Sequence, residues 1–228
     1  MARRIAVIGG TGDQGFGLVL RFARADEAVI IGSRSKSKAE DAAKKALELL
    51  GKEASVTGDE NAKAAEAADI IIMSVPFAAH VDMIKSIQDR IRPDAIFIDV
   101  VVPLSTAVGG KPTTALGVWE GSAAQQAAKL LPPSTKLASA FHNVVAESLQ
   151  DLNREVDCDV IVCSDSHETR KSVMDLVNEI PGIRAIDGGR LENSRVVEQL
   201  TALLIGINIR YRVKYSGIRI TGIQPEQN

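Results

Sequence analysis

RIAVIGGTGDQG, residues 4–15, couples a short apolar run of strand length to glycines at positions 10, 12 and 15. This spacing satisfies the pattern Gly-x-Gly-x-x-Gly, in which the first glycine permits a tight turn and the second lets a pyrophosphate approach the backbone. The third glycine lets the following helix pack closely on the strand, so that the free N–H groups of the helix N-terminus face phosphate. A structural glycine turn is the alternative. The residues expected to bind a dinucleotide are Gly10, Thr11, Gly12, Asp13, Gln14 and Gly15.

Apolar runs of strand length alternate with helical patterns along the chain that follows this motif. The expected strands lie in RIAVIGG, AVIIGS, ASVTG, DIIIMSVP and AIFIDVV, and the expected helices between them span 13–25, 36–50, 60–67 and 78–90. Short continuous apolar strands joined by helices are typical of a parallel sheet that is buried on both faces. The sequence therefore predicts an α/β protein with an N-terminal Rossmann domain, a doubly wound parallel sheet.

The second half of the chain continues the alternation with less regular spacing. A loop rich in Gly, Pro and Thr at 103–118 precedes a helix near 119–131 and a strand at 136–142. After these we expect a strand in DVIVCSD, a helix at 167–179, a strand in IRAIDGG and a long helix near 191–213. The apolar stripe of the last helix is wide enough to pack against a domain or a second subunit. We expect a dinucleotide-binding Rossmann domain at 1–142 and a small C-terminal α/β domain at 143–228.

Bulk composition is that of a globular protein with small-molecule partners. The 228 residues are 45% hydrophobic and 25% charged, and the net charge of -2 gives no reason to expect nucleic acid. Cys158 and Cys163 are expected on opposite faces of one strand, which argues against a disulfide, and no clustered ligands suggest a metal site. No apolar run approaches the roughly 20 residues that span a bilayer. We therefore expect a cytoplasmic protein with no signal peptide and no membrane partner.

The sequence IIGSRSKSK at 30–38 lacks an expected acid. A chain that binds NAD usually places Asp or Glu about 20 residues past the glycine motif, where the carboxylate holds the ribose hydroxyls. Here Ser33, Arg34 and Lys38 offer a hydroxyl, a guanidinium and an ammonium. These groups fit the 2'-phosphate of NADP, which a carboxylate would repel. For Lys36 a solvated helix start is the simpler interpretation.

Catalytic groups of the common reductases are scarce. A Tyr and a Lys four residues apart, as in short-chain dehydrogenases, do not occur, because the only tyrosines are Tyr211 and Tyr215. Among the three histidines, His167 is expected to be exposed near a helix start, and His80 either touches the cofactor or lies on a helix surface. We expect His142 at the end of a strand, where the ligand crevice of such a sheet lies.

Several stretches, taken together, resemble one family along nearly the whole chain. They are IGGTGDQG, GSRSKSKAE, ADIIIMSVPF, SAFHNVVA, VCSDS and IDGGRLENSRVVEQLT. The sequence is similar to the coenzyme F420-dependent NADP oxidoreductases, which pass hydride between a deazaflavin and NADP. The resemblance implies a homodimer, a deazaflavin pocket between two domains, NADP contacts from Thr11, Ser33, Arg34 and Lys38, and pocket contacts from His142, Arg195 and Thr201. Gln199 departs from the Ser that the family often has there.

Direct hydride transfer requires two flat rings in contact and neither a nucleophile nor a metal. Small residues in SVP, DVVVP and SAFHNVVA would let the rings approach, and they complete the expected cofactor site with Ser74, Val75, Pro76, His80, Val102 and Pro103. His142 either hydrogen-bonds the deazaflavin carbonyl or makes a structural hydrogen bond. Two other functions stay open at this point: an NADPH-dependent reductase of an imine, a ketone or a flavin that feeds ferric iron, and a non-catalytic NADP(H) sensor.

Overall fold

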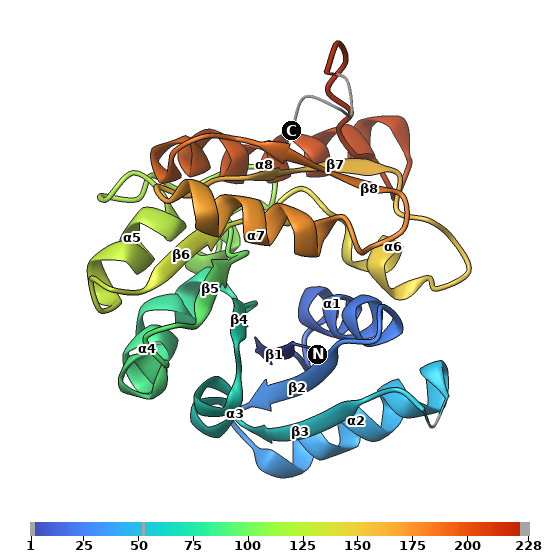
Figure 1. Cartoon of the computed structure of the whole chain (residues 1–228). Helices are drawn as coiled ribbons and strands as arrows, with labels where there is room; N and C mark the ends of the chain where they lie inside the picture. The colour runs from blue at the N-terminus through green and yellow to red at the C-terminus, as the bar shows by residue number, and fades with distance from the viewer. Residues whose placement is uncertain (1–2, 52, 224–228) are drawn as a thin grey trace.

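The computed structural model describes residues 3–51 and 53–223, and it contains a six-stranded parallel sheet (Figure 1). The strand order is β3-β2-β1-β4-β5-β6, and every neighbouring pair is parallel. The strands are β1 (Arg4–Ile8), β2 (Ala28–Ser33), β3 (Val56–Glu60), β4 (Ile70–Met73), β5 (Ile96–Asp99) and β6 (Lys136–Ser139). The order reverses between β1 and β4, which makes their carboxyl ends the expected ligand crevice of a doubly wound fold. The α/β class and the Rossmann-like sheet predicted from the sequence are confirmed.

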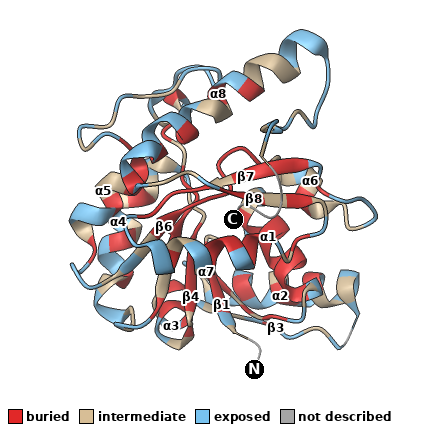
Figure 2. Cartoon of the chain, turned by 45° about the horizontal axis from the view of Figure 1, so that its top comes forward, coloured by how far each residue is buried: buried red, intermediate tan, exposed pale blue. Residues whose placement is uncertain are grey.

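Helices cover both faces of this sheet. Ile5 and Val7 of β1 belong to one buried cluster, whereas Ala6 and Ile8 belong to the other, so the alternating residues of the central strand feed two cores. The helices of the first half are α1 (Asp13–Arg24), α2 (Lys36–Leu50), α3 (Asn61–Ala67), α4 (Phe77–Ile87) and α5 (Ala123–Leu130), with short 3-10 turns at η1 (Gln88–Arg90) and η2 (Ser105–Val108). Figure 2 shows the burial of the strands between them.

The C-terminal part adds a two-stranded parallel sheet and a long helix, α8, which crosses the top of Figure 1. Its elements are α6 (Ala146–Gln150), β7 (Cys158–Val162), α7 (His167–Val177), β8 (Ile183–Asp187), η3 (Leu191–Asn193) and α8 (Ser194–Tyr211). An antiparallel bridge between Ser139 and Cys163 joins β7 to the end of β6. One buried cluster contains residues from both parts, among them Phe22, Phe141 and Val160. The division at 142/143 stays a prediction.

Among the boundaries that differ from the sequence prediction, three have clear local causes. The strand expected at 136–142 ends at Ser139, because Phe141 adopts a φ of 65° and turns the chain. The helix expected at 119–131 begins at Ala123, because the Ser122 side chain accepts the Gln125 N–H and caps it. The helix expected at 191–213 ends at Tyr211, where Arg212 takes the left-handed conformation. The short helix α6 was not predicted.

Both cysteines are buried and free, and burial raises the pKa of Cys158 to about 12 and that of Cys163 to about 11. At neutral pH both are therefore inert thiols rather than reactive thiolates. Across the described ranges 3–51 and 53–223, none of the helices combines the length and the apolar character that crossing a bilayer requires.

Candidate active site

The glycine turn lies between β1 and α1, and its glycines have separable roles. Gly9, rather than Gly10, carries the positive φ of 78° that makes the tight turn. A Cβ on Gly15 would lie 2.8 Å from the Gly9 carbonyl oxygen, so this glycine permits the close packing of α1 on the turn. A Cβ on Gly12 would meet only the Gly9 oxygen at 3.5 Å, which leaves this position open to an approaching phosphate. Gly10, predicted for this role, shares it, because a Cβ there would lie 2.8 Å from the Val7 carbonyl oxygen.

A cationic corner lies at the carboxyl end of β2. Ser33 is almost buried, and its Oγ accepts the Ser35 N–H at 3.4 Å. Arg34 and Lys38 are exposed, and neither takes part in an ion pair with another residue that the structure describes. Lys36, by contrast, lies 3.9 Å from Glu40. The N-terminus of α2, which Ser35 does not cap through its side chain, adds free N–H groups to the corner.

A cleft of about 530 Å³ runs along the carboxyl ends of β1, β4, β5 and β6. Of the residues predicted for the site, those that line it are Gly12, Asp13, Gln14, Gly15, Ser74, Val75, Pro76, Val102, His142 and Thr201. The sequence missed further lining residues, namely Phe77, Ala78, Val100, Val101, Leu104, Thr106, Ala107, Phe141 and Val144. Most of these are apolar side chains next to predicted ones, so proximity along the chain was the signal that could have found them.

Eight predicted residues lie outside the walls of this cleft: Gly10, Thr11, Ser33, Arg34, Lys38, His80, Pro103 and Arg195. Gly10 is buried behind the turn, and Thr11 is exposed at its tip. Pro103 is buried with its carbonyl oxygen accepting the Leu116 N–H, and the next residue, Leu104, faces the cleft instead. Ser33, Arg34 and Lys38 form the separate cationic corner.

His142 is the buried polar group that faces the cleft without a partner. Only 4% of this residue is exposed, and neither ring nitrogen has a hydrogen-bond partner among the described residues. Burial lowers the pKa of His142 to about 4, although the charge of Asp99 opposes the shift. The imidazole is therefore neutral at neutral pH, with one nitrogen able to donate and the other able to accept. An unsatisfied buried group at a cleft wall is what a ligand contact would complete.

Phe141 fixes the direction of that histidine. Its side chain is fully buried and packs edge-on against Phe22 of α1, with the ring centroids 6.0 Å apart. Its backbone has a φ of 65°, a conformation that a bulky residue adopts only when the surrounding packing holds it there. The Phe141 carbonyl accepts the Gln14 side-chain amide at 3.3 Å, which ties this turn to the start of α1. Nothing in the sequence signals this conformation.

Thr201 and Arg195 of α8 have different surroundings. The Thr201 hydroxyl donates to the His142 carbonyl oxygen at 2.6 Å, so α8 directly supports the histidine. Arg195 is exposed and lies off the cleft, because six residues along a helix amount to roughly 240° of rotation. Within one chain, Arg195 therefore does not line the cleft that Thr201 lines, and its contact with a deazaflavin stays a prediction.

His80 is neither on a helix surface nor in the cleft. It is fully buried, and its Nε2 lies 2.8 Å from Asp99 Oδ2 while Nδ1 lies 3.2 Å from Gln126 Oε1. Zero exposure rules out direct contact with a bound cofactor in this conformation, so the sequence expectation is corrected. His80 lies one layer behind the walls.

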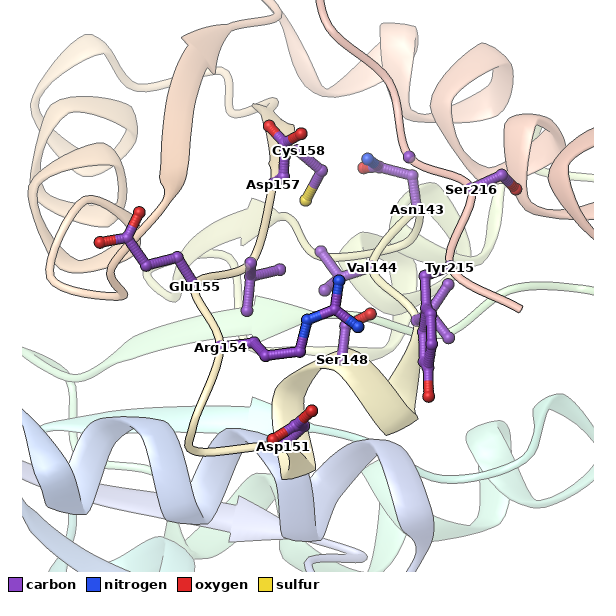
Figure 3. A pocket seen from close by; sticks show the side chains of 13 residues that line it. Asn143, Val144, Ser148, Asp151, Arg154, Glu155, Asp157, Cys158, Tyr215 and Ser216 are labelled. Atoms are coloured by element: carbon purple, nitrogen blue, oxygen red, sulfur yellow. The ribbon is translucent and has the colours of Figure 1, made fainter. Parts of the chain in front are cut away.

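Two further cavities lie near the cleft. One of about 390 Å³ shares His142, Val144 and Thr201 with it and continues toward Asn208 and Lys214. A smaller one of about 180 Å³ lies between the segment 143–158 and the C-terminal stretch, and none of the predicted site residues lines it (Figure 3). There the Arg154 side chain extends toward Tyr215, with its guanidinium carbon 5.6 Å from the ring centroid.

The cleft is lined by groups suited to binding rather than to acid–base or nucleophilic catalysis. Among its described lining residues, Asp13 and His142 are the only titratable ones, and the rest of the wall near His142 is mostly Val, Ala, Pro and Phe. No nucleophile with an adjacent base is present among these lining residues. Such a cleft suits a reaction in which the bound molecules supply the reactive atoms and the protein supplies proximity and dryness.

Comparison with known proteins agrees with this geometry. Residues 4–103 match a family described as NADP oxidoreductase, coenzyme F420-dependent. An F420-dependent NADP reductase of Methanocaldococcus jannaschii is 48% identical over 224 residues, which is 97% of this chain and 99% of the relative. One from Methanothermobacter thermautotrophicus is 47% identical over 229 residues, covering 100% of this chain and 98% of the relative.

Solved structures share the fold at lower identity. A crystal structure of an Arthrobacter sp. FB24 protein superposes with a TM-score of 0.81 at 22% identity and covers 96% of this chain and 100% of that one. An imine reductase from Bacillus cereus superposes with a TM-score of 0.60 at 13% identity, covering 92% of this chain and 62% of that one. At these identities the likeness carries the architecture alone.

Proposed function

The chain belongs to the coenzyme F420-dependent NADP oxidoreductase family, and from this membership we propose how its residues serve hydride transfer between F420 and NADP. The protein is an oxidoreductase, and both substrates are small molecules. The open alternatives, an imine or flavin reductase and a non-catalytic NADP(H) sensor, are set aside by this membership. The observation that carries the proposed site is the cleft itself, which joins the glycine turn to the neutral, unpartnered His142.

We place NADP from three features along the sheet edge. The 2'-phosphate binds at Ser33, Arg34 and Lys38, and the pyrophosphate lies over Gly12 at the N-terminus of α1. Because the adenosine end is then beyond β2, the nicotinamide must extend in the other direction, over the ends of β4 and β5. Val75 and Val101 are among the residues that line the cleft there. Small apolar walls exclude water from the reacting face.

The deazaflavin ring fits the opposite wall, where His142 and Thr201 line both the cleft and the adjoining 390 Å³ cavity. The hydride passes directly between the two bound rings, so the chain need not supply the reactive atom. We assign to His142 a hydrogen bond to the polar edge of this ring, made by a neutral imidazole. Thr201 holds the His142 backbone in place from α8.

An optical assay tests this function. Protein mixed with NADPH and oxidised F420 should bleach the deazaflavin absorbance, and no bleaching should occur when NADH replaces NADPH at the same concentration. FMN and a simple cyclic imine serve as competing acceptors. Tight NADPH binding with no turnover of F420 would contradict the proposal, and turnover of an imine alone would point to a different acceptor.

We also propose that the protein is a homodimer that pairs through α8. On this helix four apolar side chains leave more than half of their surface exposed: Val196 (59%), Leu203 (59%), Ile209 (65%) and Tyr211 (71%). Figure 2 shows exposed stretches along α8. Such a series of exposed apolar side chains on one helix suits a second copy rather than water. Arg195 and Gln199 are also exposed on α8 and so lie near this proposed interface.

Light scattering after size exclusion tests the dimer. Leu203→Glu should shift the mass from two chains toward one, because the carboxylate would be buried at the interface. Leu49→Glu is the matched control, since Leu49 is 55% exposed on α2, away from the proposed interface, and should leave the mass unchanged. An unchanged mass for Leu203→Glu would locate the contact elsewhere.

A further inference from the structure

A buried ion pair lies directly behind the nicotinamide end of the cleft. His80 comes from the first turns of α4 and Asp99 is the last residue of β5, and both side chains have zero exposed surface. His80 Nε2 and Asp99 Oδ2 are 2.8 Å apart. The free-energy cost of removing two charged groups from water can equal the attraction between them, so a buried ion pair adds little to stability. A role other than stability would explain this pair.

Hydrogen-bond geometry determines the protonation of His80. Its Nδ1 faces the Oε1 atom of Gln126 at 3.2 Å, and the Gln126 amide nitrogen lies 3.4 Å from Glu120 Oε2. The carboxylate of Glu120 can only accept, so it fixes the Gln126 amide with its oxygen toward His80. With Asp99 as a carboxylate, both ring nitrogens of His80 face acceptors, and a neutral imidazole can donate from only one of them. Paired with this carboxylate, the ring satisfies both contacts only in its doubly protonated, cationic form.

The surrounding charges agree with this assignment. Burial alone lowers the pKa of His80, but Asp99 from β5, Gln126 from α5 and Glu198 from α8 outweigh burial, so the pKa is raised above its ordinary value. Burial raises the pKa of Glu198 itself to about 8, although the N–H groups of Ala123 and Ala124 donate to its carboxylate. With this pKa Glu198 is mostly protonated near pH 7, so the charge that raises the pKa of His80 there comes from Asp99, its direct partner.

Asp99 connects this pair to the cleft. Its second oxygen, Oδ1, accepts the Val101 N–H at 2.9 Å, and its carbonyl oxygen accepts the Ala140 N–H at 3.1 Å. Val101 lines the cleft, and Ala140 leads into Phe141 and His142 on the opposite wall. One aspartate thus holds both segments between which the two rings would stack.

We propose that His80 and Asp99 form a positioning ion pair, in which the cationic imidazole orients the Asp99 carboxylate so that it fixes the backbone of Val101 under the nicotinamide. The inference rests on the proposed function, because it concerns the geometry of the same hydride transfer. Without His80 the buried carboxylate loses its direct partner and can turn away, which releases the Val101 N–H. The residues then act through the backbone and never touch substrate.

Kinetics of four variants test the pair. His80→Leu and Asp99→Asn should lower kcat by about 10- to 100-fold with a smaller change in the NADP KM, since a displacement on the order of 1 Å can cost about 100-fold. His80→Gln, which can still donate one hydrogen bond to Asp99, should recover part of kcat. Asp159→Asn is the matched control: Asp159 is equally buried and pairs with Arg184 and Arg219, but it lies on β7 away from the cleft. It should lower Tm and leave kcat and both KM values within about two-fold.

Nitrogen-15 NMR measures the protonation of the histidine rings in the unaltered protein, so this test does not depend on whether a variant folds. The chain has three histidines, so labelled imidazole nitrogens are few and assignable. Near pH 7 His80 should show two protonated ring nitrogens, whereas His142 should show one. A neutral His80, or kcat values for His80→Leu and Asp99→Asn that match Asp159→Asn, would overturn the inference. Absence of F420 turnover in the unaltered protein would instead overturn the proposed function and leave the NMR result standing.

Discussion

At the carboxyl end of β2, Arg34 and Lys38 present an exposed cationic corner beside the buried Ser33, whereas the ends of β5 and β6 present an apolar wall with the neutral His142. The first region can hold a phosphate through charge, with water available to both partners before binding. The second can hold flat rings through its shape and through single hydrogen bonds. Charged side chains are not needed there, and flexible ones would have to reorganise while the hydride moves. The cationic corner should therefore set the affinity for NADP over NAD, and the wall with His142 should set the rate of hydride transfer. Changes at the two ends should therefore alter different measured constants.

The largest expected effect is at the cationic end. Arg34→Asp replaces a guanidinium by a carboxylate beside the 2'-phosphate, so NADP affinity should fall by about 100-fold or more, an energy of about 3 kcal/mol. NAD affinity should change by less than about three-fold, because NAD has no phosphate there. Calorimetric titration with both dinucleotides measures this. Equal losses for the two would show that the phosphate binds elsewhere, and Lys36→Asp provides a control at the neighbouring cation that already pairs with Glu40.

Acid should destabilise the ring end through His142. His142 has a folded pKa of about 4, below the ordinary value of 6.5, so between these values the unfolded chain binds a proton that the folded chain does not. Its contribution to stability is therefore complete above pH 6.5 and is lost as the pH falls toward 4, by about 3 kcal/mol. Glu198 and His80, whose pKa values are raised, add slopes of the opposite sign, so the contribution of His142 is the difference between the unaltered chain and His142→Phe unfolded in urea at pH 7.5, 6, 5 and 4.5. On acidification the unaltered chain should lose stability relative to the variant, and identical slopes would assign the acid sensitivity to other groups.

His142→Phe also tests the reaction. The substitution keeps a buried ring but removes both nitrogens, so kcat/KM for F420 should fall about ten-fold, near 1.4 kcal/mol. Because neither nitrogen has a partner among the described residues, no hydrogen bond is lost on replacement and Tm should not decrease on that account. The dissociation constant for NADP should stay within about two-fold, since the dinucleotide is held mainly at the other end. A joint loss of Tm and NADP affinity would assign His142 to the structure rather than to the deazaflavin.

The two ends also differ in how far the sequence could predict them. The cationic corner follows from local order, because Ser33, Arg34 and Lys38 must emerge together wherever β2 gives way to α2. The glycine turn is equally local, although the motif gave no sign that Gly9, next to the predicted Gly10, carries the positive φ. The parallel sheet could also be predicted locally, because each strand buried on both faces is a continuous apolar run and these runs alternate with helical patterns.

The ring end depends on contacts between distant residues, and these were missed or misplaced. The sequence does not show that His80 contacts Asp99 and Gln126, because these two residues lie on other elements, far along the chain. Phe141 takes its left-handed backbone from packing against Phe22, which no local pattern encodes. Arg195 was placed by analogy with a motif, whereas the rotation of α8 decides which side chains reach the cleft.

The smallest expected effect sharpens the role of α8 at this wall. Thr201→Val keeps the shape of the side chain but removes the hydroxyl that donates to the His142 carbonyl at 2.6 Å. The F420 KM should rise by about three- to six-fold, since the lost hydrogen bond is worth roughly 1 kcal/mol and acts only by loosening His142. Thr201→Ser retains the donor and should behave as the unaltered enzyme, and NADP binding should not change in either variant. If Thr201→Ser were as impaired as Thr201→Val, the methyl group rather than the hydroxyl would support the ring, and the contact at this wall would be apolar.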